Sequence, residues 1–163
     1  MSPMNGKEAF ALVPELILVG IEAGNRREVL EIMGGNLFRQ GYVQESYIQA
    51  IQDREVHYPT GLPAAEIGVA IPHTDAVHVN KAAVSIGILK KPVLFQMMGN
   101  PSQIIEAEII FMLAIKEPQE QISMLQKLSA LFQNRTLLLD LRKTVEREQA
   151  VLLLNQALQT IPA

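Results

Sequence analysis

The sequence predicts an α/β fold in which a mixed β-sheet is flanked by helices on both sides. Strand-like apolar runs are grouped in the middle of the chain, and amphipathic helical patterns occupy both ends. The chain has 163 residues, of which 48% are hydrophobic, so it is long enough to bury a core. We therefore expect one domain over residues 1–163, with a core from about residue 8 to about residue 160.

The first quarter of the chain predicts a strand and a helix. An opening strand is expected over Ala11–Val19, although Pro14 weakens it. Asn25 is a good N-cap for the following helix, and Gly41 provides its end. The apolar face of this helix consists of Val29, Leu30, Ile32, Met33, Leu37 and Phe38.

A second short helix and four β-rich runs follow. The helix is expected over Gln44–Asp53, and prolines with a glycine predict a loop over Tyr58–Pro63. The buried side of the helix comprises Tyr47, Ile48 and Ile51. The β-rich runs are Ile67–Ile71, Ala82–Leu89, Pro92–Phe95 and Glu106–Ile115. The last run is the longest apolar stretch, so we expect it to lie centrally in the sheet.

Three helices are expected in the last third of the chain. Pro118 suits the first turn of a helix, and Asn134 suits the N-cap of the next one. The last amphipathic helix is expected over Val145–Leu158. The buried face of the first helix consists of Ile122, Leu125, Leu128, Leu131 and Phe132, and that of the second of Leu137, Leu138 and Leu141.

Composition excludes several classes of function. The net charge is −3 and no basic stripe is present, which argues against nucleic-acid binding. The chain has no cysteine, which excludes disulfides, a thiolate nucleophile and a cysteine zinc site. The apolar stretch Ala9–Ile21 is too short to span a bilayer, and no targeting segment stands out. We expect a soluble, cytoplasmic protein.

The three histidines of the chain all lie between His57 and His78. His73 follows Pro72 at the end of an apolar run, and proline keeps the preceding Ile71 extended. The imidazole should therefore project where a strand meets a loop, which is where ligand sites of α/β folds cluster. A neutral imidazole is a competent nucleophile near pH 7 and can accept a phosphoryl group.

Phosphoryl transfer requires mainly positioning and electrostatic stabilisation. Arg54 offers a planar fork for phosphate oxygens. Thr60 and Thr74 offer neutral hydrogen-bond donors, and His78 can donate to the phosphate or hold the tautomer of His73. Each residue also has a plainer role: the histidines can be exposed surface residues, Arg54 a cation at a helix C-terminus, and Thr60 a turn residue. For His57 the plainer role is the expected one.

A family resemblance rests on three motifs. These are Asp53-Arg54-Glu55, Tyr58-Pro59-Thr60-Gly61 and Gly68-Val69-Ala70-Ile71-Pro72-His73. Together they resemble the enzyme IIA domains of the sugar phosphotransferase system, in the fructose–mannitol class, from near Arg27 to near Leu158. The Pro-Thr-Gly loop, the spacing of His73 and His78, and the segment Glu117–Gln121 look most like the galactitol-type branch.

The resemblance implies a phosphotransferase that carries a phosphoryl group. Members of this family accept the group from phospho-HPr on the histidine that corresponds to His73. They pass it to a cysteine of enzyme IIB, which phosphorylates the sugar that enters through the membrane component IIC. Arg54 is implied to stabilise the phosphoryl oxygens. A mixed sheet flanked by helices is implied as the fold, and no metal or organic cofactor is required.

One position departs from the family pattern. Mannitol- and fructose-type members usually carry a second active-site histidine at the start of the helix after Pro118, where this chain has Gln121. An amide donates hydrogen bonds but cannot become protonated to bring a positive charge. Either His78 takes over this role, or a second active-site histidine contributes less in this chain.

Two alternative functions remain open. One is a metal-dependent hydrolase in which the three histidines, with Asp75 or Glu55, hold zinc, although no ligand pair with helical spacing is present. The other is a regulatory module, like the nitrogen-type enzyme IIA proteins, in which phosphorylation of His73 controls the binding of a partner. The sugar itself is selected mainly by the membrane component.

Overall fold

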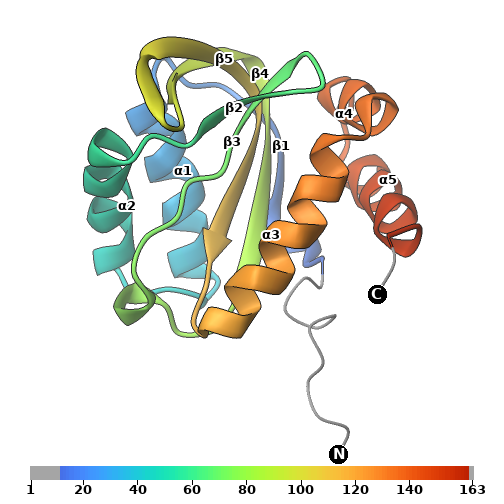
Figure 1. Cartoon of the computed structure of the whole chain (residues 1–163). Helices are drawn as coiled ribbons and strands as arrows, with labels where there is room; N and C mark the ends of the chain where they lie inside the picture. The colour runs from blue at the N-terminus through green and yellow to red at the C-terminus, as the bar shows by residue number, and fades with distance from the viewer. Residues whose placement is uncertain (1–11, 162–163) are drawn as a thin grey trace, which may run out of the picture.

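A computed structural model describes residues 12–161 and contains one mixed five-stranded sheet with helices on both faces (Figure 1). The strands are β1 (Ile17–Ile21), β2 (Gly61–Ala64), β3 (Ile67–Ala70), β4 (Ala83–Met97) and β5 (Asn100–Ala114). The α-helices are α1 (Arg26–Arg39), α2 (Ser46–His57), α3 (Pro118–Phe132), α4 (Arg135–Arg142) and α5 (Arg147–Gln159). Two short 3-10 helices are η1 (Pro14–Leu16) and η2 (Ala76–His78).

The sheet has the order β1-β4-β2-β3-β5, and β4 also pairs with β5 in an antiparallel ladder. The parallel pairs are β1 with β4, β2 with β4 and β3 with β5. Helices α1 and α2 cover one face, and α3, α4 and α5 lie against the other (Figure 1). This arrangement confirms the predicted mixed sheet with flanking helices. Because β5 lies between β3 and β4, the prediction of a central position for this segment is also confirmed.

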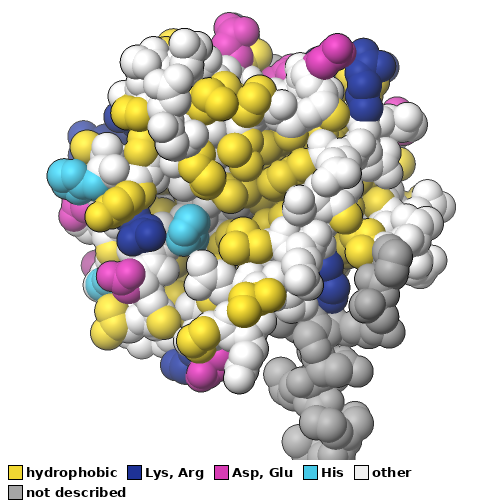
Figure 2. All heavy atoms as spheres, viewed as in Figure 1, with side chains coloured by type: hydrophobic (Ala, Val, Ile, Leu, Met, Phe, Trp, Pro, Cys, Tyr) yellow, Lys and Arg dark blue, Asp and Glu magenta, His cyan; other side chains and the backbone are white. Residues whose placement is uncertain are grey.

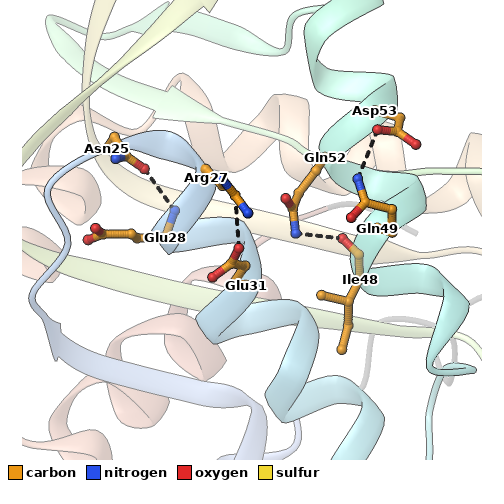
Figure 3. A network of polar contacts seen from close by, with 8 residues as sticks. All are labelled: Asn25, Arg27, Glu28, Glu31, Ile48, Gln49, Gln52 and Asp53. Atoms are coloured by element: carbon orange, nitrogen blue, oxygen red, sulfur yellow. Dashed lines mark hydrogen bonds and ion pairs between the residues drawn. The ribbon is translucent and has the colours of Figure 1, made fainter.

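The ends of α1 form as their residues predict. The side chain of Asn25 accepts a hydrogen bond from the backbone N–H of Glu28 at 3.0 Å, which satisfies one of the free donors of the first turn (Figure 3). The neighbouring pair Arg27–Glu31 follows the i,i+4 spacing on the exposed side of the helix. Gly41 has a φ of +85°, the left-handed conformation that commonly ends a helix.

Several predicted boundaries were wrong, and prolines account for two of them. Pro14 begins the 3-10 turn η1, so the first strand starts at Ile17; Ala11 lies outside the described residues. Pro63 lies within β2, so the predicted loop ends at Thr60. The second helix continues beyond Asp53 to His57, which puts the Arg-Glu dipeptide in its last turns.

The two predicted strands Ala82–Leu89 and Pro92–Phe95 are one strand. β4 runs through the intervening lysines, and its pairing with β5 shifts register between Ile88 and Val93. Pro92 lies within this irregularity, where a missing N–H costs no regular ladder bond. The strand therefore continues past a proline that predicted its interruption.

Each face of the sheet has its own apolar core. The core under α1 and α2 includes Tyr47 and Phe95, and the core under α3–α5 includes Phe111, whose ring meets Phe132 edge-on at 5.1 Å between centroids. Four residues predicted to be buried are exposed: Ile32, Phe38, Ile122 and Leu125. The core-facing residues of α3 are Met124, Leu128 and Leu131. None of the helices within residues 12–161 is long and apolar enough to cross a membrane.

Candidate active site

His73 is held at the end of β3 by hydrogen bonds of the backbone before it. The N–H of Ile71 donates to the carbonyl of Thr60 at 3.2 Å, and the N–H of Leu113 donates to the carbonyl of Pro72 at 2.9 Å. The imidazole itself is half-buried, and its Nδ1 lies 2.8 Å from the carbonyl oxygen of Ile71. A carbonyl oxygen only accepts, so Nδ1 carries the proton and Nε2 of the neutral ring has the free lone pair.

The surroundings of His73 favour this neutral form. Burial lowers the pKa of His73 below its ordinary value of 6.5. The hydrogen bond to Ile71 opposes this decrease in the pKa, the positive charge of Arg54 adds to it, and the negative charge of Asp75 opposes it. The ring is therefore uncharged at neutral pH, and Nε2 is available as a nucleophile.

Arg54 lies in the last turn of α2 and has two partners. Its Nη1 is 3.9 Å from Oδ1 of Asp75, and its Cζ lies 4.8 Å from the centroid of the Tyr58 ring. The side chain of Arg54 is 34% exposed and lies beside the loop that carries His73 and Asp75. The cation–π contact and the ion pair together orient a group that suits anionic oxygens.

The sequence reasoning did not assign these two partners of Arg54. Tyr58 stands four residues after Arg54, and an i,i+4 spacing on a helix places two side chains next to each other, so this contact could have been found. Asp75 comes from a different element, and no local pattern predicts its pairing.

Glu55, the neighbour of Arg54, points into the protein. It is 2% exposed; its Oε2 accepts from the backbone N–H of Thr60 at 2.8 Å, and its Oε1 accepts from the Thr60 hydroxyl at 2.7 Å. Burial raises the pKa of Glu55 to about 7, although the bonds from Thr60 and the charge of Arg26 act in the opposite direction.

The predicted donor Thr60 is therefore placed behind the site. Its single hydroxyl proton is directed to Glu55, while its carbonyl accepts from the N–H of Ile71. Because the carbonyl of Ile71 in turn accepts from the His73 ring, hydrogen bonds link Glu55 through Thr60 to the imidazole. The geometry gives Thr60 a supporting position rather than a surface position.

Two glycines of the motifs permit close packing of strands around the site. A Cβ on Gly61 would lie 2.7 Å from the carbonyl oxygen of Gln96, and a Cβ on Gly68 would lie 2.0 Å from that of Glu106. Both distances are too short for any side chain, because the contacted atoms belong to backbone of neighbouring strands. The glycines allow β2 and β3 to approach β4 and β5 where the histidine loop begins.

His78 contacts the opposite end of α2 from Arg54. Its Nδ1 lies 2.8 Å from Oγ of Ser46, the first residue of α2. Ser46 is eight residues before Arg54, which corresponds to about 12 Å along the helix axis. The structure thus brings His73 and Arg54 together and gives His78 a separate partner; the role of His78 in transfer stays a prediction.

The remaining predicted residues occupy different environments. Thr74 is buried directly after His73, and Gln121 is exposed in the first turn of α3. His57 is exposed at the end of α2, and thus the three histidines do not converge. Across residues 12–161, no group of three histidine, aspartate or glutamate side chains is arranged to hold a metal ion. The roles of Thr74 and Gln121 stay predictions.

An apolar area lies next to a histidine and a basic side chain on the face shown in Figure 2. Helix α3 runs along this face in the same view (Figure 1), and two apolar residues of this helix, Ile122 and Leu125, are exposed. Tyr58, which contacts Arg54, is exposed as well. An exposed apolar area of this kind is typical of a surface that another protein contacts.

Fold and site together place an imidazole with an unbonded Nε2 at a strand end, with an arginine beside its loop. Over residues 11–157, the sequence matches the family described as "Phosphoenolpyruvate-dependent sugar phosphotransferase system, EIIA 2", and the chain belongs to this family. It is a phosphotransferase component that carries a phosphoryl group in sugar transport, as predicted.

Known relatives show both transport and regulatory contexts. The galactitol-specific EIIA component of Escherichia coli K12 is 29% identical over 107 residues, which cover 66% of this chain and 71% of the relative. The transcriptional regulator ManR of Bacillus subtilis is 31% identical over 107 residues, covering 66% of this chain and 15% of ManR. A structure of enzyme IIAMTL from Escherichia coli in complex with phosphorylated enzyme IIBMTL superposes with a TM-score of 0.76 and 25% identity, covering 90% of this chain and 99% of that chain.

Proposed function

We propose that Nε2 of His73 accepts a phosphoryl group from phospho-HPr and passes it to a cysteine of an enzyme IIB. The observation that carries this proposal is the 2.8 Å hydrogen bond between Nδ1 and the Ile71 carbonyl, which leaves the lone pair on Nε2. In the first step the N–P bond of the donor breaks as the Nε2–P bond forms, and the donor nitrogen regains its lone pair. In the second step the Nε2–P bond breaks, a P–S bond forms, and the thiol proton goes to water.

Arg54 supplies the electrostatic part of the proposal. Phosphoryl transfer is accelerated mainly by charge stabilisation, and a guanidinium can bind two phosphoryl oxygens at once. Arg54 lies beside the loop that carries His73, because its Nη1 is 3.9 Å from Oδ1 of Asp75, two residues after the histidine. The exchange between nitrogen and sulfur involves no redox change, and the proposal includes no cofactor.

The partners follow from the chemistry and from the relatives. Residues 1–163 contain no cysteine, so the thiol that receives the phosphoryl group lies outside this sequence. The relative IIAMTL is known in complex with phosphorylated IIBMTL, which supports an enzyme IIB as that protein. The exposed apolar area beside a histidine and a basic side chain in Figure 2 provides a surface for such a partner. We further propose that the protein acts in the cytoplasm and that the pathway includes a membrane component IIC. The proposed sugar is galactitol-like, because one relative is galactitol-specific.

A regulatory role is the second candidate, and the similarity to ManR favours it. In that case phosphorylation of His73 changes the affinity of this chain for a partner protein. Both candidates share the phosphorylation of His73 and differ in what happens to the phosphoryl group afterwards.

The test is phosphorylation with phosphoenolpyruvate, enzyme I and HPr, followed by mass spectrometry. We expect one acid-labile phosphate, which His73→Ala abolishes and the matched control His57→Ala retains. Arg54→Ala should slow the transfer while circular dichroism shows an intact fold. Normal phosphorylation of His73→Ala would refute the proposal. Phosphoryl transfer from the phosphorylated protein to a galactitol-type enzyme IIB distinguishes transport from a purely regulatory role.

A further inference from the structure

Asp75 and His73 share one loop, and both lie beside Arg54. Asp75 is two residues after the histidine, and its Oδ1 is 3.9 Å from Nη1 of Arg54. The two charges shift the pKa of His73 in opposite directions, Arg54 lowering it and Asp75 raising it. The site therefore holds one cation and one anion next to the proposed phosphoryl acceptor.

Phosphorylation of Nε2 would add a second anion to this pair. The phosphoryl oxygens and the Asp75 carboxylate would then compete for the same guanidinium, and they would also repel each other. The contact between Arg54 and Asp75 is suited to exchange, because it is longer than the ion pairs Arg135–Glu66 at 3.0 Å and Arg142–Glu108 at 3.3 Å. The Asp75 side chain is 78% exposed, so its carboxylate is not needed to fill or close a core.

On the basis of the proposed function, we propose that Asp75 tunes how readily His73 gives up its phosphoryl group. Asp75 holds Arg54 while His73 is unphosphorylated. Once the phosphoryl group is bound, the carboxylate competes with it for Arg54 and so raises the free energy of the phosphohistidine. Asp75 thus acts through Arg54, and it favours donation of the group to the next protein over its retention.

The test compares Asp75→Asn with wild type in the transfer equilibrium with HPr. Removal of the carboxylate should shift this equilibrium toward the phosphorylated protein by about three- to tenfold, the range for an exposed like-charge interaction that solvent partly screens. The equilibrium for onward transfer to the enzyme IIB cysteine should fall by the same factor. Asp75→Glu retains the charge and should restore wild-type behaviour. Asp140→Asn makes the same chemical change on the exposed surface of α4 and serves as the control.

Two further measurements separate tuning from a structural effect. The difference between Asp75→Asn and wild type should shrink in about 1 M salt, where charges are screened within about 3 Å. The pKa of His73, followed by NMR, should decrease in Asp75→Asn, because the carboxylate raises it in the wild type. Unchanged equilibria in Asp75→Asn, or a less stable phosphohistidine, would overturn the inference. Failure of the proposed function is distinguishable, because wild-type His73 would then not be phosphorylated at all.

Discussion

Glu55→Gln is expected to remove a pH dependence from the stability of the protein. The glutamine keeps the shape of the side chain, and its amide oxygen can still accept from the backbone N–H of Thr60. The Thr60 hydroxyl can rotate to accept from the new amide. The substitution therefore removes the ionisable group while both contacts to Thr60 remain satisfied.

The magnitude follows from the environment of the carboxyl group. Burial raises the pKa of Glu55 from 4.5 to about 7. A carboxyl group with a raised pKa binds its proton more tightly in the folded state. The stability it contributes is complete below about pH 4.5 and is lost as the pH rises through about 7. At about 1.4 kcal/mol per pH unit, the total loss is ~3 kcal/mol, of which roughly 2.5 kcal/mol falls between about pH 5 and about pH 8.5.

The assay is urea denaturation of wild type and Glu55→Gln at several pH values in this interval. The free energy of unfolding of the variant, relative to wild type, should increase by roughly 2.5 kcal/mol toward high pH. Glu45→Gln, which removes an exposed carboxylate next to the start of the same helix, is the control for the loss of one negative charge. A difference between Glu55→Gln and wild type that stays constant with pH would refute the reasoning.

Two further predictions concern the hairpin that leads to the histidine. Gly68→Ala should lower the free energy of unfolding by about 3 kcal/mol, since its Cβ would lie 2.0 Å from the backbone carbonyl oxygen of Glu106. Gly24→Ala, whose Cβ would lie 3.6 Å from a flexible side chain, is the control in the same urea titration, and equal losses would contradict this explanation. Ala65→Asn should stabilise the protein by about 0.5–1 kcal/mol, because Ala65 and Glu66 have φ of +43° and +72° in a two-residue hairpin loop that favours asparagine at its first position. Thermal unfolding at or below the wild-type midpoint would contradict that prediction.

The local features of the fold could be predicted from the sequence. Asn25 and Asn134 both cap helices, because an N-cap depends on a side chain and the three residues that follow it. His73 lies at a strand end as predicted, because Pro72 restricts the backbone immediately before it. These features are determined within a few residues, so one sequence contains the information.

The features that were not predicted correctly depend on contacts between segments that are distant in the sequence. The pairing of β4 with β5 continues across Pro92 through a register shift, which no pattern within β4 indicates. On α3, Ile122 and Leu125 have the same apolar character as Leu128, and only the tertiary packing shows which of them face the core. The burial of Glu55 likewise depends on the position of Thr60, whose backbone N–H donates to the Glu55 carboxylate.

The contact between His78 and Ser46 ties the segment that follows Asp75 to the start of α2. Besides this contact, the N–H of Gln44 donates to the carbonyl of His78 at 2.8 Å, and Val43 bridges to Val79. None of these contacts involves Arg54, and the N–H of His78 donates to the carbonyl of Asp75 at 3.2 Å. The segment that follows Asp75 is therefore fixed to the start of α2, so under the proposed exchange of Asp75 for a phosphoryl group we expect the side chains around His73 to rearrange rather than this segment. A partner that distinguishes the two proposed states is then expected to contact the surface around His73.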